Sequence, residues 1–413
     1  MLRLYDTHSR TKRAFRPLNG NTVRIYTCGP SVYAYSHIGN FRTYLFEDVL
    51  VRYLRFKGYG VKRVMNITDV EDKAIVAARK ERRTLDSLQK DKIRAFFSDY
   101  GRLGMRRPDV VAKASAHVPQ MIGLVSRICA RGYCVKGGNG DVYFDVRKFR
   151  GYGRLKRLRT NAYFGKAKGD DYAREGLWDF ILWKKWTRGD GAVGWNSQFG
   201  YGRPGWHIEC SAMSTHYLGE TFDIHCGGSD NIYPHHENEI AQGFAASGKP
   251  PAKFWLHARH LTINKRKMSK RTGNVLYVRQ LLKEGLHPQC LRFYLISERY
   301  RSPLDFTWNE FKKRTCGCEH TRGVLAKLRK LGGTRNRKRE TGNGKRGNAV
   351  ARKLLAGFGS AMDDDLNTKL AFKRIFRAMG EAESLLAAGK LDAAGARAIL
   401  AALERINSVL GVF

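Results

Sequence analysis

The sequence contains no run of about 18 consecutive apolar residues, the length that a membrane-spanning helix needs. Its first residues, MLRLYD, lack the apolar core of a secretory signal peptide. Eight cysteines among 413 residues are too few for a scaffold held by disulfides, so we expect core residues, metal ligands or unreactive thiols in a reducing cytosol. The chain has no internal repeat. These absences argue against a membrane protein and predict a cytoplasmic one.

Acidic residues are scarce as well. Lys and Arg number 76 against 37 Asp and Glu, which gives a net charge of +39. Such a surplus repels itself and favours a polyanionic partner, because binding to phosphates releases their counterions. Nucleic acid is the first candidate, and a general basic bias or salt adaptation is the alternative. The basic residues are spread along the chain, so charge alone does not locate a binding groove.

The N-terminal part has the pattern of a strand, a loop, a helix and a second strand. Residues 23–28 form a short apolar run, residues 45–54 carry apolar side chains at helical spacing, and residues 61–66 are again apolar. Lys57-Gly58 is a typical end for the helix between them. This order predicts the beginning of a parallel, Rossmann-like sheet.

A chain of 413 residues should form two or three domains. We predict an α/β fold whose Rossmann-like catalytic domain comprises residues 1–84 and 200–306. Residues 85–199 are predicted to form a connective insertion, helical at first and then rich in glycine and aromatics. The mainly helical pattern of residues 307–413 predicts a helical bundle. Within it, residues 334–348 are polar and basic, as in an exposed linker or an RNA-contacting loop.

A first motif that could bind a nucleotide lies between the first predicted strand and its helix. It reads His37-Ile38-Gly39-Asn40. Helix N-termini attract anions, a histidine there can hydrogen-bond triphosphate oxygens, and a glycine lets a nucleotide approach the backbone. The alternative is a turn histidine that caps the helix.

A second motif, Lys267-Met268-Ser269-Lys270-Arg271, follows much later in the chain. Two lysines three residues apart can neutralise a pyrophosphate leaving group, although an exposed basic turn would look the same. Taken together and in this order, the two motifs resemble the HIGH and KMSKS signatures of class I aminoacyl-tRNA synthetases.

A third set of residues could bind a metal ion. Cys28 ends the first predicted strand, and Cys210 lies in the segment GWHIEC. His235 and Glu239 lie in PHHENE, four residues apart, and would share one face of a helix that begins near Pro234. Two thiolates, an imidazole and a carboxylate make a plausible zinc shell. Because there is no CxxC pair, the spacing does not decide between a metal site and a set of unrelated buried residues.

Longer segments resemble cysteinyl-tRNA synthetases nearly from end to end. They are YTCGP, NITD, GWHIEC, DIH, GGSD and PHHENE, with LRLY near the N-terminus and AMDDDLNT in the helical part. The resemblance implies that the four candidate ligands hold one zinc ion per chain. Zinc would bind the thiolate of the substrate and so select cysteine without an editing domain, because serine offers a harder and less acidic oxygen.

The resemblance also implies roles for single residues and partners. Catalysis would rest on His37, Asn40, Lys267 and Lys270. These four would also bind ATP together with Gly39, Met268 and Ser269, and the substrate pocket would contain Thr68, Trp206, His225 and Asp230. Taken alone, Thr68 could be a turn residue, Trp206 a core aromatic and Asp230 a helix cap. The implied partners are ATP with Mg²⁺, L-cysteine and tRNA(Cys), and we expect a monomer.

Some positions depart from the family pattern. Asn40 stands in place of the second histidine of HIGH, and Arg271 in place of the final serine of KMSKS. Cys226 lies where the family often has glycine, and could be a fifth sulfur at the site or a small core residue. Cys316 and Cys318 could suggest a second metal, but a turn of a surface helix is the simpler interpretation.

The further C-terminal domain with which the family reads the anticodon is expected to be missing or shortened. This leaves a rival of the mycothiol type, a ligase that joins cysteine to glucosaminyl-inositol, and a second rival, a non-catalytic RNA-binding paralogue. The charge of +39 and the segment AMDDDLNT argue against the first rival. The retained His37, Lys267 and Lys270 argue against the second. The leading hypothesis is a cysteine–tRNA ligase.

Overall fold

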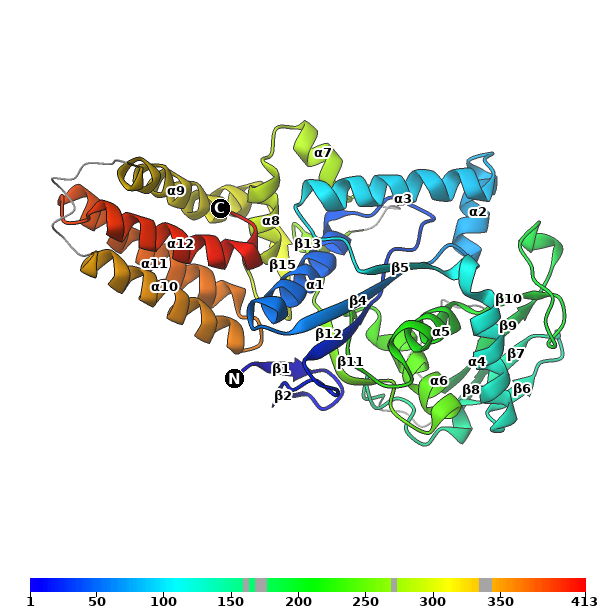
Figure 1. Cartoon of the computed structure of the whole chain (residues 1–413). Helices are drawn as coiled ribbons and strands as arrows, with labels where there is room; N and C mark the ends of the chain where they lie inside the picture. The colour runs from blue at the N-terminus through cyan, green and yellow to red at the C-terminus, as the bar shows by residue number, and fades with distance from the viewer. Residues whose placement is uncertain (159–162, 168–176, 269–272, 334–343) are drawn as a thin grey trace.

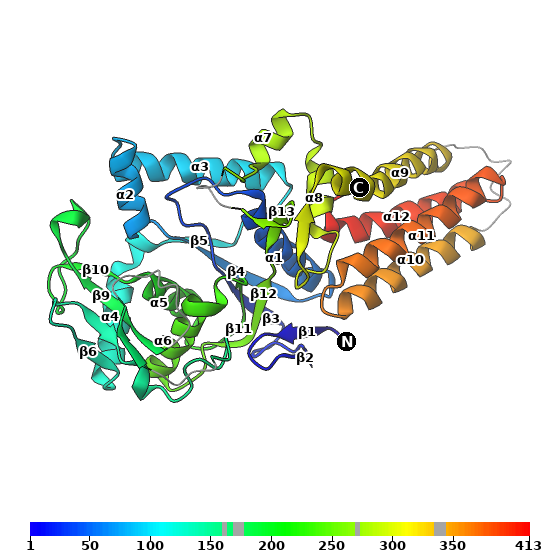
Figure 2. The same cartoon turned by 180° about the vertical axis from the view of Figure 1, so that it is seen from behind.

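The structure is a computed structural model. It describes residues 1–158, 163–167, 177–268, 273–333 and 344–413. Figure 1 shows a central parallel sheet with a helical bundle on one side and a second, smaller sheet on the other, and Figure 2 shows the same arrangement from behind. No helix among the described residues is long and apolar enough to cross a membrane.

The central sheet confirms the predicted Rossmann-like fold. Its strand order is β12-β11-β3-β4-β5, and all neighbours pair in parallel. The helices α1, α5 and α6 lie in the sequence between strands of this sheet. Helix α1 ends at its C-cap residue Lys57, as predicted. The bounds are β3 (Thr22–Thr27), α1 (Ile38–Phe56), β4 (Gly60–Ile67), β5 (Val110–Lys113), α5 (Trp206–Leu218), β11 (Phe222–Gly228), α6 (Glu237–Ser247) and β12 (Ala252–Ala258).

The predicted insertion boundary at residue 85 does not follow the sheet. Strand β5 lies inside the range 85–199, yet it pairs with β4 and forms an edge of the central sheet. A strand of four residues with only one buried side chain, Ala112, is too short to give a clear apolar pattern. The other elements of the range are α3 (Leu85–Arg102), α4 (Val118–Ala130), β6 (Cys134–Lys136), β7 (Val142–Phe144), β8 (Tyr163–Lys166) and β9 (Leu177–Lys185).

The second sheet has the order β10-β9-β7-β6, with β8 beside β9 and β10 at Gly202–Pro204. Next to it, Cys129 near the end of α4 forms a disulfide with Cys134 at the start of β6. The expectation that the cysteines are thiols or metal ligands is therefore wrong for this pair. A separation of five residues gives no sign of a disulfide, because the turn that brings the two sulfurs together becomes visible only in the fold.

A small three-stranded sheet carries the second signature motif. Its order is β14-β13-β15, with β13 (Leu261–Ile263) parallel to β15 (Leu304–Phe306) and antiparallel to β14 (Arg266–Lys267). The remaining short elements lie outside the large sheets. They are β1 (Arg3–Asp6), β2 (Thr11–Ala14), α2 (Asp72–Lys80), α7 (Val278–Lys283) and α8 (Pro288–Ile296).

The predicted C-terminal helical bundle is present. It consists of α9 (Trp308–Gly332), α10 (Lys345–Asp363), α11 (Thr368–Ala387) and α12 (Ala393–Leu410). Helix α10 begins at Lys345, so the last residues of the predicted linker 334–348 are helical, and residues 334–343 lie outside the described residues.

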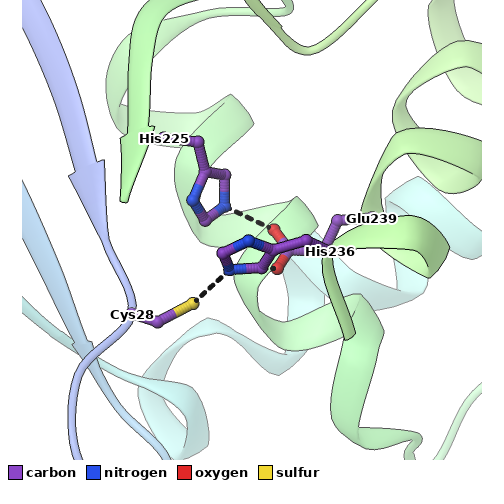
Figure 3. Close-up of side chains that lie close together, drawn as sticks. All are labelled: Cys28, His225, His236 and Glu239. Atoms are coloured by element: carbon purple, nitrogen blue, oxygen red, sulfur yellow. Dashed lines mark hydrogen bonds and ion pairs between the residues drawn. The ribbon is translucent and has the colours of Figure 1, made fainter. Parts of the chain in front are cut away.

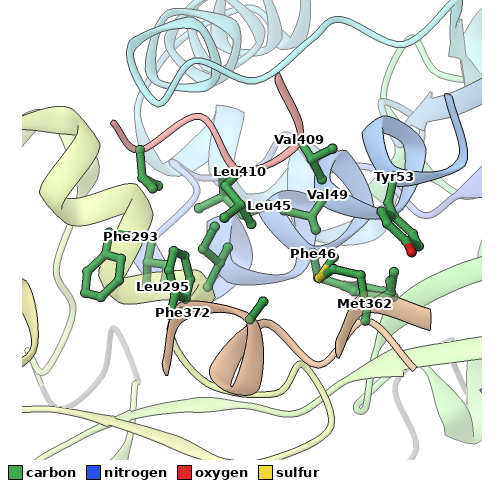
Figure 4. Packing of buried hydrophobic residues seen from close by; sticks show 14 of the residues in the cluster. Leu45, Phe46, Val49, Tyr53, Phe293, Leu295, Met362, Phe372, Val409 and Leu410 are labelled. Carbon is green, nitrogen blue, oxygen red and sulfur yellow. The ribbon is translucent and has the colours of Figure 1, made fainter. Parts of the chain in front are cut away.

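The bundle and the central sheet share one apolar core. Side chains of α1 meet side chains of α8 and of the bundle helices α10, α11 and α12, as Figure 4 shows. Because burial of apolar surface drives this contact, we expect the bundle and the sheet to be held firmly against each other. The residues labelled there are Leu45, Phe46, Val49, Tyr53, Phe293, Leu295, Met362, Phe372, Val409 and Leu410.

Candidate active site and metal centre

A cavity of about 260 Å³ opens where the loop after β3 meets the end of β11. This is the carboxyl end of a parallel sheet, where open α/β folds bind their ligands. His37, Asn40, Trp206 and Asp230 line it, together with Cys28. A neighbouring cavity of about 80 Å³ shares His37, Asn40 and Asp230 and is also lined by Gly39, Lys267 and Met268. The two signature motifs therefore meet across adjacent cavities.

His37 and Asn40 form a reciprocal cap at the start of α1. The backbone N–H of His37 donates to Asn40 Oδ1, and the backbone N–H of Asn40 donates to His37 Nδ1. Because Nδ1 accepts a hydrogen bond, the proton of the neutral ring lies on Nε2. The capping interpretation of His37 is thus correct, and the ring also lines both cavities, where its Nε2–H can serve as a donor.

Gly39 leaves room for Met268. A Cβ atom at Gly39 would lie 2.4 Å from Met268 Cε and 3.1 Å from the His37 ring, so a larger residue would have to push the Met268 side chain aside and would crowd His37. Lys267 is the last residue of β14 and lines the small cavity. Ser269 and Lys270, also predicted here, lie outside the described residues.

The four predicted substrate residues do not all line the cavity. Trp206 and Asp230 do, and Trp206 stacks on the His235 ring at 4.6 Å. Thr68 is buried and accepts a hydrogen bond from Asn66. His225 is buried, and its Nε2 lies 2.8 Å from Glu239 Oε2. Neither Thr68 nor His225 is among the residues that line either cavity.

The four candidate metal ligands lie together. One donor atom from each of Cys28, Cys210, His235 and Glu239 lies within 4.8 Å of every other, and all four residues are buried. A π-helical segment, Ile232–His236, contains His235 and continues directly into α6 at Glu237, as expected for a helix that begins near Pro234. His235 Nε2 lies 3.0 Å from Glu239 Oε1, four residues further on. Residues from three separate segments thus converge at the carboxyl end of the sheet.

Comparison with known proteins places this geometry in a family. Residues 14–315 match the family described as tRNA synthetases class I (C) catalytic domain, and residues 357–413 match the DALR domain. The chain is 40% identical to the cysteine–tRNA ligase of Chlamydia pneumoniae over 416 aligned residues, with 100% of this chain and 86% of the relative covered. The chain belongs to the cysteine–tRNA ligase family.

A second relative agrees with this assignment, and a solved structure shows the same fold. The cysteine–tRNA ligase of Pseudomonas aeruginosa is 40% identical, with 100% of this chain and 85% of the relative covered. The fold matches Mycobacterium tuberculosis methionyl-tRNA synthetase in complex with methionyl-adenylate at 15% identity and a TM-score of 0.68, covering 95% of this chain and 92% of that chain. The expected shortening of the C-terminal region does not extend to the DALR domain, which the chain matches.

The charges in this cysteine–tRNA ligase family site are those of a cation-binding cluster. Burial raises the pKa of Cys210, but hydrogen bonding to Cys28 and the charge of His235 bring it down to about 6. Burial likewise raises the pKa of Glu239, but His225 and His235 lower it to about 2. Burial lowers the pKa of His235, while Glu239 and Cys210 raise it to about 10. Near neutral pH, the Cys210 thiolate and the Glu239 carboxylate therefore flank a protonated His235. A bound metal ion would take the place of that proton. This donor set fits zinc.

Sequence reasoning missed His236 as a member of the site. A second group of metal-compatible residues comprises Cys28, His225, His236 and Glu239 (Figure 3). Cys28 Sγ lies 3.2 Å from His236 Nε2, and His225 Nε2 lies 2.8 Å from Glu239 Oε2. The adjacent histidines of PHHENE were the available signal, but only the fold shows that both rings face the same cysteine.

The other cysteines in question are not part of this centre. Cys226 is fully buried in the apolar core, which favours the core interpretation over a fifth sulfur at the site. Cys316 and Cys318 belong to neither of the metal-compatible groups found among the described residues. Cys316 is exposed and Cys318 is buried on α9, so they lie on different faces of one helix.

Proposed function

We propose that this protein is a cysteine–tRNA ligase, which activates L-cysteine with ATP and transfers the cysteinyl group to the 3′ end of tRNA(Cys). The observation that carries the proposal is that Cys28 of the metal-compatible tetrad lines the cavity that the first motif lines, while the neighbouring smaller cavity is lined by both nucleotide-binding motifs. A generic adenylate-forming enzyme has no need for a cysteine-rich cluster there. Relatives named cysteine–tRNA ligase, which match the chain over its whole length, support the proposal.

In the first step, the cysteine carboxylate attacks the α-phosphate of ATP in line and pyrophosphate leaves. His37 Nε2–H is placed to donate to the triphosphate, and Lys267 to neutralise the leaving pyrophosphate. We assign Lys270 the same role by resemblance, and Mg²⁺ enters with ATP. The enzyme acts by positioning and charge stabilisation rather than by forming covalent intermediates of its own. In the second step, the terminal ribose hydroxyl attacks the carbonyl carbon of the cysteinyl adenylate, the bond to the phosphate oxygen breaks so that AMP leaves, and the hydroxyl proton is lost to solvent.

Selection of the amino acid is assigned to the tetrad of Cys28, Cys210, His235 and Glu239. A zinc ion bound there would supply a coordination position for the substrate sulfur. The chain itself provides two thiol sulfurs, an imidazole and a carboxylate shielded from water. Trp206, stacked on His235, is placed to fix the orientation of that ring and to close one wall of the cavity. Thr68, His225 and Asp230 stay proposed substrate-pocket residues.

The partner is proposed to be tRNA. The net charge of +39 and the matched DALR domain support a polyanionic acceptor over a small amino sugar. In this proposal residues 85–199, apart from β5, face the acceptor arm, and residues 307–413 contact the inner side of the tRNA. The protein would act in the cytoplasm as a monomer.

A paired assay tests the proposal. Cysteine-dependent exchange of pyrophosphate into ATP measures the first step, and formation of cysteinyl-tRNA measures the second. Both activities are expected. Exchange without charging, but with amide formation on glucosaminyl-inositol, would favour the mycothiol type, and the lack of cysteine-dependent exchange would contradict any cysteine ligase.

A further inference from the structure

Arg42 is a fully buried arginine one turn along α1 from His37. Its guanidinium donates to four backbone carbonyls, and these belong to two segments far apart in the sequence. Two of the acceptors, Arg259 O and His260 O, directly precede strand β13. The other two, Arg299 O and Ser302 O, precede strand β15.

These four carbonyls lie at one end of the small sheet that carries the second motif. Strands β13 and β15 pair in parallel, with Leu261 opposite Leu304, so both strands start beside Arg42. Strand β14, which ends at Lys267, pairs with β13. Arg42 on α1 therefore holds the starts of β13 and β15. Strand β14 of the same sheet places Lys267 in the lining of the cavity that His37 also lines.

The segment before β15 also contacts the helical bundle. We call residues 297–302 the junction loop. Glu298 Oε2 lies 3.0 Å from Lys369 Nζ on α11 and 3.5 Å from Arg314 Nη1 on α9. The hydroxyl of Thr368, which begins α11, donates to Glu298 O. Burial lowers the pKa of Arg42 to about 10 and Glu298 opposes this, so Arg42 stays charged near neutral pH.

The turn between α10 and α11 binds residues 300 and 301 of the junction loop through Asp365. Asp365 is buried and accepts from the Tyr300 hydroxyl at 2.7 Å and from Arg301 Nε at 2.6 Å. The Tyr300 ring in turn stacks on Phe46 of α1 at 4.1 Å, and the Tyr300 carbonyl accepts from the Arg259 N–H. The junction loop is thus tied to the bundle on one side and to α1 and the start of β13 on the other.

We propose that Arg42 is a positioning residue that sets the distance between the two nucleotide-binding motifs, and that the junction loop makes this distance sensitive to how the bundle is seated. This inference rests on the proposed function. Displacement of the small sheet by about 1 Å would move Lys267 away from the pyrophosphate, and misplacements of that size can cost about 100-fold in rate. Substrate selection, which rests on the distant tetrad, would not change.

The test compares Arg42→Lys with Arg52→Lys in the full-length protein. A lysine has no planar fork, so it cannot reach carbonyls of both segments at once. Arg52 is a matched control, because it lies on the same helix and also donates to two backbone carbonyls, Ser408 O and Gly104 O, away from the small sheet. We expect Arg42→Lys to lower kcat for cysteine-dependent exchange 10- to 100-fold with KM for cysteine changed less than about threefold. Zinc content should stay the same, and Arg52→Lys should keep wild-type kcat.

A second variant tests the bundle side and guards against misfolding of Arg42→Lys. Asp365→Asn turns an acceptor of Arg301 into a donor, which loosens the junction loop from the bundle. Because the junction loop holds the start of β15 beside Arg42, we expect kcat for cysteine-dependent exchange to fall about tenfold per active site, with KM for cysteine and KM for tRNA unchanged. A purely structural contact would raise KM for tRNA or lower the fraction of active protein.

The outcomes separate the inference from the proposed function. If the wild-type protein shows no cysteine-dependent exchange, the proposed function fails. If the wild type exchanges and charges, but folded Arg42→Lys keeps the wild-type kcat or Asp365→Asn changes only KM for tRNA, the positioning role is overturned and the proposed function stands.

Discussion

The backbone N–H of His37 donates to Asn40 Oδ1 at 3.0 Å, while the backbone N–H of Asn40 donates to His37 Nδ1 at 3.2 Å. Asn40 replaces the second histidine of the HIGH signature, and in this chain it closes the first turn of α1 and fixes the His37 ring. The relationship gives Asn40 a role in orientation in addition to any contact with phosphate.

Replacement of Asn40 by alanine should therefore affect stability and activity together. Loss of the cap should lower the free energy of unfolding by about 1 kcal/mol. A less constrained His37 ring should lower kcat for exchange by up to about 100-fold. Asn40→Asp is the control, because it keeps the capping oxygen but places a carboxylate beside the triphosphate. It should unfold like the wild type and show a raised KM for ATP. If Asn40→Ala kept full exchange activity, the orienting role would be wrong.

Zinc content should depend on Cys210 and not on Cys226. Cys210→Ser removes one ligand of the tetrad, so it should lower both zinc content and cysteine affinity while ATP affinity stays near wild type. Cys226→Ser also changes a buried thiol, but that thiol belongs to neither group of candidate ligands, and the Cys226 carbonyl that accepts from the Cys28 N–H stays in place. It should keep about one zinc ion per chain, measured by atomic emission. Equal zinc content in the two variants would remove Cys210 from the site.

The buried ion pair of Glu47 and Arg63 lies beneath the active site. Arg63 Nη2 is 2.8 Å from Glu47 Oε2, and Arg63 Nη1 donates to the Tyr100 hydroxyl at 2.9 Å. Glu47→Leu or Arg63→Met alone should cost about 3–5 kcal/mol, because each leaves its buried ionisable partner unpaired. The double variant Glu47→Leu with Arg63→Met should cost far less than the sum. Denaturant unfolding measures all three, and additive effects would show that the two side chains do not act as a pair.

Stability should fall in acid because of Asp48. Burial raises the pKa of this carboxyl, but Arg292 at 2.6 Å and Arg52 at 2.8 Å outweigh burial and hold the pKa below its ordinary value. A carboxyl whose folded pKa is depressed adds stability above its unfolded pKa, and this stability is lost as the pH falls. Unfolding between pH 6 and about pH 3 should therefore show a decreasing free energy, with a shallower slope for Asp48→Asn. The exposed control Asp86→Asn should follow the wild type, and identical slopes for all three would contradict the assignment.

The sequence alone predicted the parts of the fold that repeat a local pattern. The apolar runs predicted β3 and β4 to within one residue at each end, and the end of α1 at Lys57, because burial on a sheet and helical periodicity are local signals. Helix α1 begins at Ile38, seven residues before the apolar pattern that starts at Leu45. Strand β5 was missed, since four residues with one buried side chain carry too little pattern. The disulfide between Cys129 and Cys134 was missed because a distance in space, not in sequence, decides it.

The site shows the same division between local and spatial information. The sequence motifs indicated His37, Lys267 and the four metal ligands. Only the fold could show that the donor atoms of the four ligands lie within 4.8 Å of one another. The contacts of His236 with Cys28 and of Arg42 with four carbonyls were not predictable. Neither depends on spacing along the chain, because each joins segments that only the packed sheet brings together.

Binding of cysteine and serine before and after removal of zinc tests the account most directly. Calorimetric titration should show that the protein as isolated binds cysteine and rejects serine by about 10⁴-fold or more. After chelation, cysteine binding should be lost and ATP binding kept, and added zinc should restore cysteine binding. Equal affinity for cysteine with and without the metal would contradict the claim that Cys28, Cys210, His235 and Glu239 select the substrate through its sulfur.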